Sequence, residues 1–390
     1  MRRSFASALA LSFFALPAVA AEPQPFTVRD LVTMQRISEP QPSPQGDRVA
    51  FVVRTTDLEA NRGRFDLWMV NMDGTGLTRL TSDPAADNNP RWAPDGKSLY
   101  FLSSRSGSNQ VWRLPAGGGD PVQVTNLPLD VANLTVSPDG SRIAFSLEVF
   151  PDCATLACTK ERLDQNEKRK ESGQLYQGDT GFYRHWDTWS DGRLNHLFVM
   201  PVAGGEPVDL TKGMKSDVPS RPFGGAEELT FSPDGRSVVF SARAGGREEP
   251  WSTNFDLYLV PVDGSRPPQN LTAANPAWDT QPTFSPDGKT LAYLAMARPG
   301  YEADRFRIRL RDMASGREVV LAEEWDRSAG EVVFSDDGRT IYMSVQDTGQ
   351  TPLVAIDVST GRVTKLVSEG HVREPALAGE RIVFGRDTLK

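Results

Sequence analysis

The residues best suited to binding chemistry lie in one stretch near the middle of the chain. Between positions 176 and 189 the sequence gathers aromatic, basic and acidic side chains, among them Arg184, His185, Trp186, Asp187 and Trp189. Indole rings can form an apolar wall, a guanidinium can clamp a peptide carbonyl or carboxylate, and an imidazole can donate a hydrogen bond. We therefore take these five residues as a candidate substrate-binding site. The alternative is that the tryptophans anchor the stretch to the protein and that Arg184 pairs with Asp187.

The sequence holds no complete set of catalytic residues. The Gly-x-Ser-x-Gly turn of α/β-hydrolases does not occur in the 390 residues, and neither does the alternating strand and helix pattern that supports it. His196 stands at the start of a predicted strand and His371 in a connecting segment, so we expect hydrogen-bonded or surface histidines rather than catalytic bases. No catalytic residue is assigned.

The two cysteines, Cys153 and Cys158, lie close together with four residues between them. In an oxidising compartment the simplest expectation is a disulfide, which would stabilise the short loop by about 2 kcal/mol. The only histidines, His185, His196 and His371, are not spaced with the cysteines as a zinc motif requires. We therefore expect a disulfide, no metal site and no cofactor.

The first 21 residues have the pattern of a secretory signal peptide. Arg2 and Arg3 give a positive start, an apolar run follows from Leu9 to Leu16, and small residues occupy 18–21. The apolar run is well short of the ~20 residues that span a bilayer, so we expect cleavage rather than a membrane anchor. The sequence thus predicts a periplasmic or secreted protein with no membrane span after cleavage.

Composition excludes one large class of partner. The chain is 24% charged and 38% hydrophobic, which is ordinary for a globular protein. Its net charge of -8 lacks the surplus of lysine and arginine that nucleic-acid binders use to neutralise phosphates. Nucleic acid is therefore not an expected partner.

One unit is repeated along the chain, and its first marker is a tetrad of the type Ser-Pro-Asp-Gly. Six copies begin at residues 43, 93, 137, 232, 285 and 335. Proline presets φ at the second position, aspartate bonds to nearby backbone at the third, and glycine takes the left-handed conformation at the fourth. Apolar segments flank each tetrad, and two further strands follow, separated by a glycine turn. Four strands per unit predict the blades of a β-propeller.

One interval between tetrads, from residue 137 to residue 232, is nearly double the others. We assign the excess to an insertion at about 150–195 in the third blade, because a normal third strand resumes at Leu197. A dense run of alternating charges at 160–171 favours a solvated helix in its first half. The candidate binding site occupies its second half.

A seventh unit begins at Ala376 and supplies two strands before Lys390. A propeller closes by packing its last blade against its first, and two strands alone would leave edges exposed. The sequence therefore predicts an all-β, seven-bladed propeller over residues 22–390, with an incomplete last blade, a partly helical insertion in blade 3 and a truncated C-terminus.

Several of these features together resemble the prolyl oligopeptidase family. The signal peptide, the segment 26–31 before Ile37–Pro40, the tetrads and the run from Arg184 to Trp189 look like bacterial dipeptidyl aminopeptidases and acylaminoacyl peptidases. TolB-like periplasmic propellers share the tetrad, so the run is the more specific part. In that family a propeller precedes a C-terminal α/β-hydrolase domain with the catalytic serine, aspartate and histidine. Because the sequence lacks the Gly-x-Ser-x-Gly turn and the strand and helix pattern of that domain, we expect the domain to be absent from this chain.

The resemblance implies the substrate-gating and recognition part of a secreted serine exopeptidase that hydrolyses short peptides. Its partners would be peptide substrates and its own hydrolase domain. The alternative is a stand-alone TolB-like periplasmic propeller that binds a protein partner. Glu227 and Glu228 invite comparison with the paired glutamates that hold the substrate amine in some dipeptidyl peptidases. They directly precede the predicted strand Leu229–Phe231, so we expect a structural role.

Overall fold

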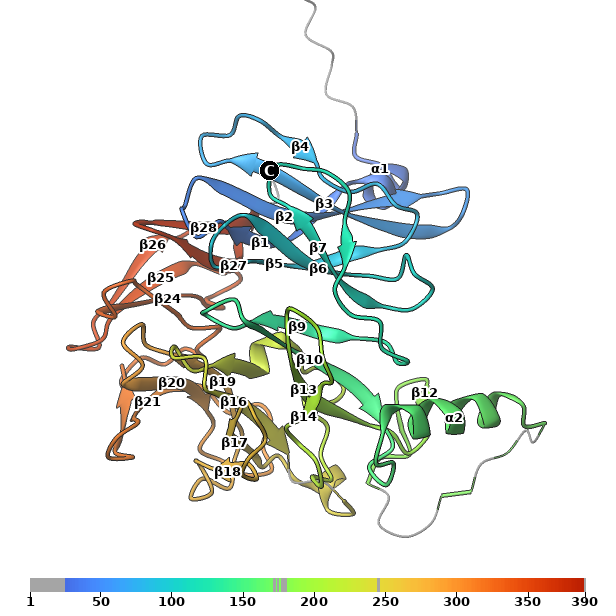
Figure 1. Ribbon diagram of the computed structural model, residues 1–390. Coiled ribbons are helices and arrows are strands. Elements are labelled where there is room, and N and C mark those ends of the chain that lie inside the picture. The colour runs from blue at the N-terminus through green and yellow to red at the C-terminus, as the bar shows by residue number, and fades with distance from the viewer. Residues whose placement is uncertain (1–24, 171–172, 174, 177–180, 244–245, 389–390) are drawn as a thin grey trace, which may run out of the picture.

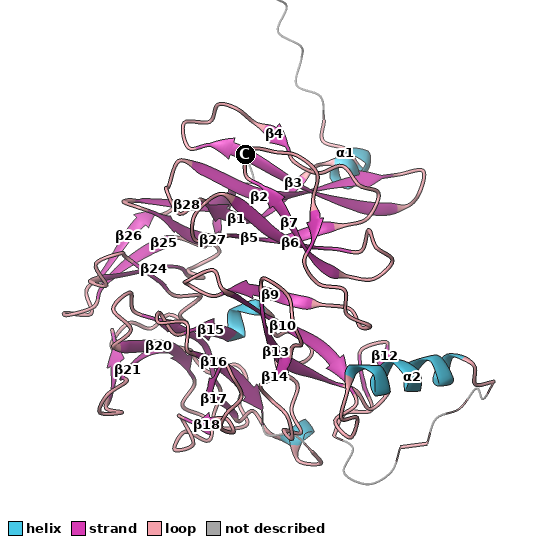
Figure 2. Cartoon of the chain, viewed as in Figure 1, coloured by secondary structure: helices cyan, strands magenta, loops and turns pink. Residues whose placement is uncertain are grey.

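The computed structural model describes residues 25–170, 173, 175–176, 181–243 and 246–388. The predicted signal peptide, residues 1–21, lies outside the described residues. Within the described ranges most of the regular elements are β-strands, and two are α-helices (Figure 2). Neither helix has the length and apolar character that a bilayer span requires.

Four-stranded antiparallel sheets follow one another around the molecule as the blades of a propeller (Figure 1). Blade 1 contains β1 (Arg36–Pro42), β2 (Arg48–Asp57), β3 (Arg62–Asn71) and β4 (Thr78–Arg79). Blade 2 contains β5 (Asp87–Trp92), β6 (Ser98–Ser103), β7 (Gln110–Pro115) and β8 (Val122–Gln123). Blade 3 contains β9 (Ala132–Val136), β10 (Arg142–Val149), β13 (Leu194–Pro201) and β14 (Val208–Asp209).

The remaining blades repeat this pattern. Blade 4 contains β15 (Leu229–Phe231), β16 (Ser237–Arg243), β17 (Phe255–Pro261) and β18 (Gln269–Asn270). Blade 5 contains β19 (Asp279–Phe284), β20 (Thr290–Ala295), β21 (Arg307–Asp312) and β22 (Glu318–Leu321). Blade 6 contains β23 (Val333–Phe334), β24 (Thr340–Ser344), β25 (Leu353–Asp357) and β26 (Val363–Val367). The short elements outside the blades are α1 (Val28–Thr33) and the 3-10 turns η1 (Ala226–Glu228) and η2 (Glu249–Trp251).

The predicted number of seven blades is corrected to six. The described residues form six four-stranded blades and one further two-stranded sheet in the ring, made by β27 (His371–Ala378) and β28 (Arg381–Asp387). This sheet corresponds to the seventh repeat, but it has only the two inner strands of a blade. The all-β class and the four-stranded blades are confirmed.

The Ser-Pro-Asp-Gly turns have the conformation that the sequence predicts. In blade 3, Ser137 Oγ donates a hydrogen bond of 2.6 Å to Asp139 Oδ1 and accepts one of 2.9 Å from Arg142 N. Gly140 has a φ of 69°, a left-handed conformation that glycine adopts without a steric penalty. A Cβ on Gly140 would lie 3.0 Å from Pro94 Cδ in the turn of blade 2. The turns of these neighbouring blades therefore pack on each other.

The hairpin of β27 and β28 closes the ring between blade 6 and blade 1. Val383 of β28 packs against the buried side chains of Val49 and Phe51 in β2. Glu39 N in β1 donates a hydrogen bond of 2.8 Å to Glu374 Oε2 in β27. Figure 1 accordingly shows the first and last strands side by side, in blue and red. The hairpin thus occupies the position of a blade.

The insertion lies on the face of the propeller where neighbouring blades are connected. Because neighbouring strands are antiparallel, the second strand of a blade ends at the same edge of the sheet at which the first strand begins. The β10–β13 loop, which carries the insertion, therefore lies at the same edge as the connection from blade 3 to blade 4. α1 precedes β1 and lies on this side as well, to the right in Figure 1.

The insertion contains α2 (Leu156–Glu167) and a small hairpin of β11 (Arg184–His185) and β12 (Thr188–Trp189). Cys153 and Cys158 form a disulfide, as the sequence predicts. Thr155 caps α2 by accepting a hydrogen bond of 3.2 Å from Cys158 N. Arg162 binds both carboxylate oxygens of Asp152 at 2.8 Å. These contacts hold the start of α2, while the helix extends away from the blades (Figure 1).

Candidate functional site

A cavity of about 550 Å³ lies between the insertion and the connection from blade 3 to blade 4. Three segments contribute most of its lining: the insertion around 181–194, the connection around 215–222, and the loop around Gly246 and Glu249. His185, Trp186 and Trp189, three of the five predicted site residues, line the cavity. Arg184 and Asp187 do not contribute to its lining.

Aromatic rings form one wall of this cavity. The Phe182 ring lies 4.8 Å from the His185 ring, between centroids, and Trp186 meets Phe223 edge-on at 5.4 Å. Trp186 and Phe223 nevertheless remain 69% and 74% exposed. Two large exposed aromatic side chains beside a cavity provide apolar surface for a ligand.

Trp186 occupies the tip of the β11–β12 hairpin in a strained conformation. Its φ of 48° lies in the left-handed region, which costs a bulky residue on the order of 1–3 kcal/mol. Arg184 Nη1 donates a hydrogen bond of 2.9 Å to Trp186 O, and its guanidinium lies 5.6 Å from the Trp189 ring centroid. Arg184 therefore supports the hairpin. No ion pair joins it to Asp187, although both residues are described.

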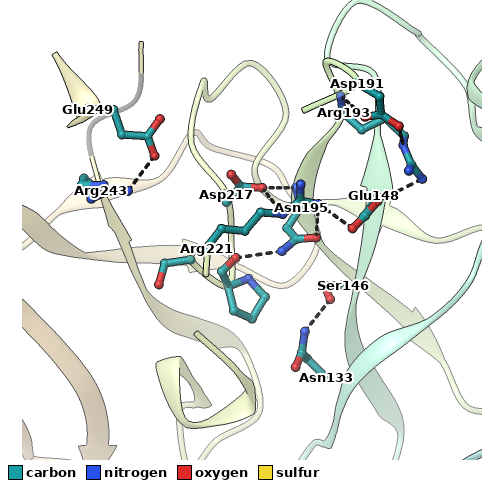
Figure 3. Close-up of polar contacts among 12 residues, drawn as sticks. Asn133, Ser146, Glu148, Asp191, Arg193, Asn195, Asp217, Arg221, Arg243 and Glu249 are labelled. Carbon is teal, nitrogen blue, oxygen red and sulfur yellow. Dashed lines mark hydrogen bonds and ion pairs between the residues drawn. The ribbon is translucent and has the colours of Figure 1, made fainter. Parts of the chain in front are cut away.

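Ion pairs centred on Arg221 form another side of the cavity (Figure 3). Arg221 Nη2 lies 2.5 Å from Glu148 Oε1, and Arg221 Nε lies 3.2 Å from Asp217 Oδ1. Arg193 Nη1 contacts the other oxygen of Glu148 at 3.0 Å. Asn195 N donates a hydrogen bond of 2.7 Å to Asp217 Oδ1. The network fixes two carboxylates relative to the strands of blade 3.

Burial dominates the electrostatics of the cavity. It raises the pKa of Asp217 to about 6, although Arg221 and the Asn195 N–H act in the opposite direction. Burial also lowers the pKa of His185, while the nearby Glu249 carboxylate partly opposes that shift. His185 is therefore mainly a neutral imidazole at neutral pH, with one nitrogen able to donate and the other able to accept.

Glu249 contributes a third carboxylate from the β16–β17 loop. Its Oε1 lies 3.0 Å from Arg243 Nη2. The Arg243 guanidinium lies between two rings, 5.2 Å from the Phe182 centroid and 5.0 Å from that of Phe255. Arg243 thus links the aromatic wall to Glu249 through ionic and cation–π contacts.

The sequence pattern did not identify Asp217, Arg221 or Glu249. Asp217 and Arg221 lie in the connection between blades 3 and 4, Glu249 begins the short 3-10 turn η2, and no motif connects them to the aromatic run. One signal was available, because the connection between Asp209 and Leu229 is much longer than the corresponding segment between Arg79 and Asp87. A long connection on a binding face is a reason to search it for functional side chains.

Glu227 and Glu228 do not lie together in this cavity. Glu228 is buried and accepts hydrogen bonds of 2.7 Å from both the backbone N–H and the hydroxyl of Ser220. Burial raises its pKa to about 7. Glu227 instead lines a second cavity at the centre of the ring. Their positions therefore do not form a paired-carboxylate site.

The two other histidines also lie outside the cavity lining. His196 is buried in blade 3, and its Nδ1 lies 2.8 Å from Asp209 Oδ2. His371 Nδ1 lies 3.1 Å from Thr351 Oγ1, next to the β27–β28 hairpin. Both histidines thus have structural polar partners.

The central cavity has a volume of about 690 Å³ and is lined by the inner strands of several blades. Its charged residues are Glu39, Arg91, Glu227, Glu331 and Glu374. Burial lowers the pKa of Arg91, whereas the surrounding carboxylates oppose this shift. Among the described residues there is no group of three or more histidine, cysteine, aspartate or glutamate side chains arranged to hold a metal ion.

Comparison with known proteins gives relatives among peptidases. A family model described as the TolB β-propeller domain matches residues 29–168. Dipeptidyl-peptidase 5 from Porphyromonas gingivalis is 28% identical over 344 residues, which cover 87% of this chain and 49% of that protein. Dipeptidyl-peptidase 5 from Porphyromonas endodontalis is 30% identical over 326 residues, covering 79% and 45%. The chain spans about half the length of these curated relatives.

Solved structures show the same fold at low sequence identity. An acylaminoacyl peptidase in complex with Z-Gly-Gly-Phe-chloromethyl ketone has a TM-score of 0.67 and 16% identity, and the match covers 91% of this chain and 49% of that one. The β-propeller domain of the trilobed protease from Pyrococcus furiosus has a TM-score of 0.56 and 14% identity, with 91% and 90% covered. At these identities the likeness supports the fold alone.

Proposed function

Because this chain is a relative of the dipeptidyl-peptidase 5 proteins within the prolyl oligopeptidase family, we propose that it is the substrate-recognition propeller of a secreted serine exopeptidase. The full enzyme would hydrolyse short peptides by acyl transfer. The propeller would bound the space that a peptide enters and exclude folded proteins by size. A separate α/β-hydrolase domain would supply the nucleophile, base and oxyanion donors.

The observation that carries this proposal is the cavity beside the insertion. It combines an aromatic wall, at Phe182 and Trp186, with the charged groups around Arg221. A peptide presents apolar side chains and polar backbone groups together, so a cavity with both kinds of lining suits it.

We propose two further features of the whole protein, one for the last hairpin and one for residues 1–21. The hairpin of β27 and β28 would be the inner half of a seventh blade, because it occupies a blade position and carries the same repeat. Residues 1–21 would direct export to the periplasm or the medium, in keeping with the disulfide between Cys153 and Cys158.

Peptide binding to this chain tests the proposal directly. Calorimetric titration with short apolar peptides is expected to show binding. Trp186→Ala is expected to weaken this binding about tenfold, since a buried aromatic contact contributes roughly 1–2 kcal/mol. Trp251→Ala is the matched control, because Trp251 is 75% exposed and does not line the cavity. An equal loss of peptide affinity in both variants, or no peptide binding at all, would contradict the proposal.

The TolB-type match to residues 29–168 favours one alternative, a propeller that docks a protein partner without hydrolysis. The two functions differ in the activity of the whole protein. A full-length protein that cleaves dipeptidyl or aminoacyl chromogenic substrates and loses this activity with a serine-directed inhibitor supports the peptidase. A full-length protein without such activity supports the docking propeller.

A further inference from the structure

The hairpin of β11 and β12 is held against the propeller through few of its residues. Within 181–189, Gly181, Phe182 and His185 are partly buried and the other residues are exposed. All three partly buried residues line the cavity. The contacts that hold them against blade 4 therefore also fix one wall of the cavity.

Arg243, the last residue of β16, provides the surface on which Phe182 packs. Its guanidinium lies 5.2 Å from the Phe182 ring centroid and 5.0 Å from that of Phe255. Only 10% of the Arg243 side chain is exposed, and its Nε is buried with no hydrogen-bond partner among the described residues. A desolvated cation gains more from contact with ring faces than a solvated one does, so this contact is a strong anchor for Phe182.

The support beneath Arg243 continues into blade 5. Phe255 pairs with Arg243 in the register of β16 and β17, and its ring stacks on Trp278 with 4.5 Å between centroids. Trp278 in turn meets Phe306 edge-on at 5.7 Å. Because Phe255 is buried in this series of rings, Arg243 cannot shift without repacking two blades. The insertion of blade 3 is thus anchored on a rigid part of blades 4 and 5.

The same arginine also positions the loop against which the insertion backbone lies. Arg243 Nη2 lies 3.0 Å from Glu249 Oε1 (Figure 3). A Cβ on Gly181 would lie 2.6 Å from Gly246 O and 2.9 Å from Glu249 Oε2. The two segments therefore approach so closely that position 181 has no room for a side chain. Arg243 holds both partners of this contact, Phe182 on the insertion and Glu249 on the loop.

We propose that Arg243 is a positioning residue for peptide binding, which holds the insertion against blade 4 so that the aromatic wall of the cavity is formed before a peptide arrives. Arg243 does not line the cavity, so it acts through Phe182 and Glu249 rather than on the peptide. A preformed wall spares the peptide the entropic cost of ordering the hairpin. This inference rests on the proposed peptide-binding function and adds the residue that preorganises its site.

Arg243→Lys tests the inference, because lysine keeps a charge for Glu249 but lacks the planar face that packs on Phe182. Two quantities are measured on the 390-residue chain: the calorimetric affinity for Phe-Ala-Ala amide, and the hydrogen exchange of the amides in 181–190. The affinity is expected to fall about five- to tenfold. Exchange is expected to accelerate in 181–190 and to stay unchanged in β16 and β17.

Arg105→Lys is the matched control in blade 2. The Arg105 guanidinium lies 5.2 Å from the ring centroids of both Phe101 and Trp112, and its Nη2 contacts Asp87 at 2.7 Å. Arg105 therefore has two rings and one carboxylate, as Arg243 does, but it does not line the cavity or contact the insertion. The control is expected to change neither the affinity nor the exchange of 181–190. An equal loss of affinity in both lysine variants would overturn the inference.

A double-mutant cycle separates positioning from an independent effect on the peptide. Phe182→Leu removes the ring through which Arg243 acts, so Arg243→Lys should weaken the peptide by less than about twofold when Phe182→Leu is already present. Additive losses of affinity would mean that Arg243 does not act through Phe182, and the inference would fall.

The two readouts also separate this inference from the function on which it rests. If the peptide binds and Arg243→Lys leaves either its affinity or the exchange of 181–190 unchanged, the recognition function stands and the inference falls. If the peptide does not bind the unaltered chain, both fall. Should Arg243→Lys unfold, Gly181→Ala decides, because its Cβ would push the insertion away from Gly246 while Arg243 stays in place. The same loss of affinity and faster exchange in 181–190 are expected, and unchanged values would overturn the inference.

Discussion

Arg221 Nη2 lies 2.5 Å from Glu148 Oε1, and this ion pair joins the connection between blades 3 and 4 to the end of β10. The same guanidinium contacts Asp217 Oδ1 at 3.2 Å (Figure 3). One arginine therefore sets the positions of two carboxylates that come from different segments. Its planar fork of donors makes it better suited to this task than a lysine.

Replacement of Arg221 by methionine is expected to destabilise the protein by roughly 1–3 kcal/mol. Glu148 and Asp217 would lose their shared cation, although the partial exposure of Glu148 limits the cost. Urea unfolding measures the effect. Arg221→Lys keeps the charge without the planar fork of donors, so its stability should lie between those of the unaltered protein and the methionine variant. A methionine variant as stable as the unaltered protein would show that the ion pairs contribute no net stability.

Asp279 should make stability fall as pH rises. It is fully buried in blade 5, Asn275 donates a hydrogen bond of 2.8 Å to its Oδ1, and its Oδ2 has no partner among described residues. Burial raises the pKa of Asp279 to about 7, with the nearby Arg309 opposing and Asp256 reinforcing the shift. Between about pH 4 and pH 7 the unfolded chain loses this proton while the folded chain keeps it. Stability is therefore lost over that interval, by up to about 1.4 kcal/mol per pH unit.

Asp279→Asn removes this proton while keeping an acceptor for Asn275. The variant is expected to gain stability relative to the unaltered protein at pH 8 and to show little difference at pH 4. Urea unfolding at the two pH values provides the comparison. If the stability difference between the two proteins is the same at pH 4 and at pH 8, Asp279 does not titrate in this interval.

The blades were predictable from sequence because each depends on local chemistry. Ser137, Asp139 and Gly140 form a turn whose hydrogen bonds and left-handed glycine are encoded within one tetrad. The Cys153–Cys158 disulfide follows from proximity along the chain. The sequence predicts a seven-bladed propeller with an incomplete last blade, whereas the described residues form six blades and the last repeat forms a two-stranded sheet.

The polar half of the cavity was not predictable in the same way. Arg221 and Glu148 are distant in sequence and meet only because the long connection folds back beside β10. The aromatic half was recognised through Trp186 and Trp189, which are clustered in one segment. The clustering directed the prediction to the insertion, and ligand binding by its five residues stays a prediction. Arg184 Nη1 donates a hydrogen bond to Trp186 O within the hairpin.

Loss of the disulfide should loosen α2 without unfolding the propeller. The loop between Cys153 and Cys158 is short, so its closure contributes only about 2 kcal/mol. In the double variant Cys153→Ser and Cys158→Ser, hydrogen exchange is expected to accelerate in α2. Arg162 and Asp152 still hold the helix start, so exchange in the blades is expected to stay unchanged. Accelerated exchange throughout the blades would contradict this local role.

Gly140→Ala should test how strongly neighbouring blades depend on their packed turns. The new Cβ would meet Pro94 Cδ at 3.0 Å and would force alanine to a φ of 69°, so a loss of roughly 1–2 kcal/mol is expected. Gly117→Ala is the matched control, because its φ is not in the left-handed region and a Cβ there meets no atom within 4 Å. Thermal unfolding compares the two. Similar midpoints for both variants would mean that the turn of blade 3 adjusts freely and does not couple blade 3 to blade 2.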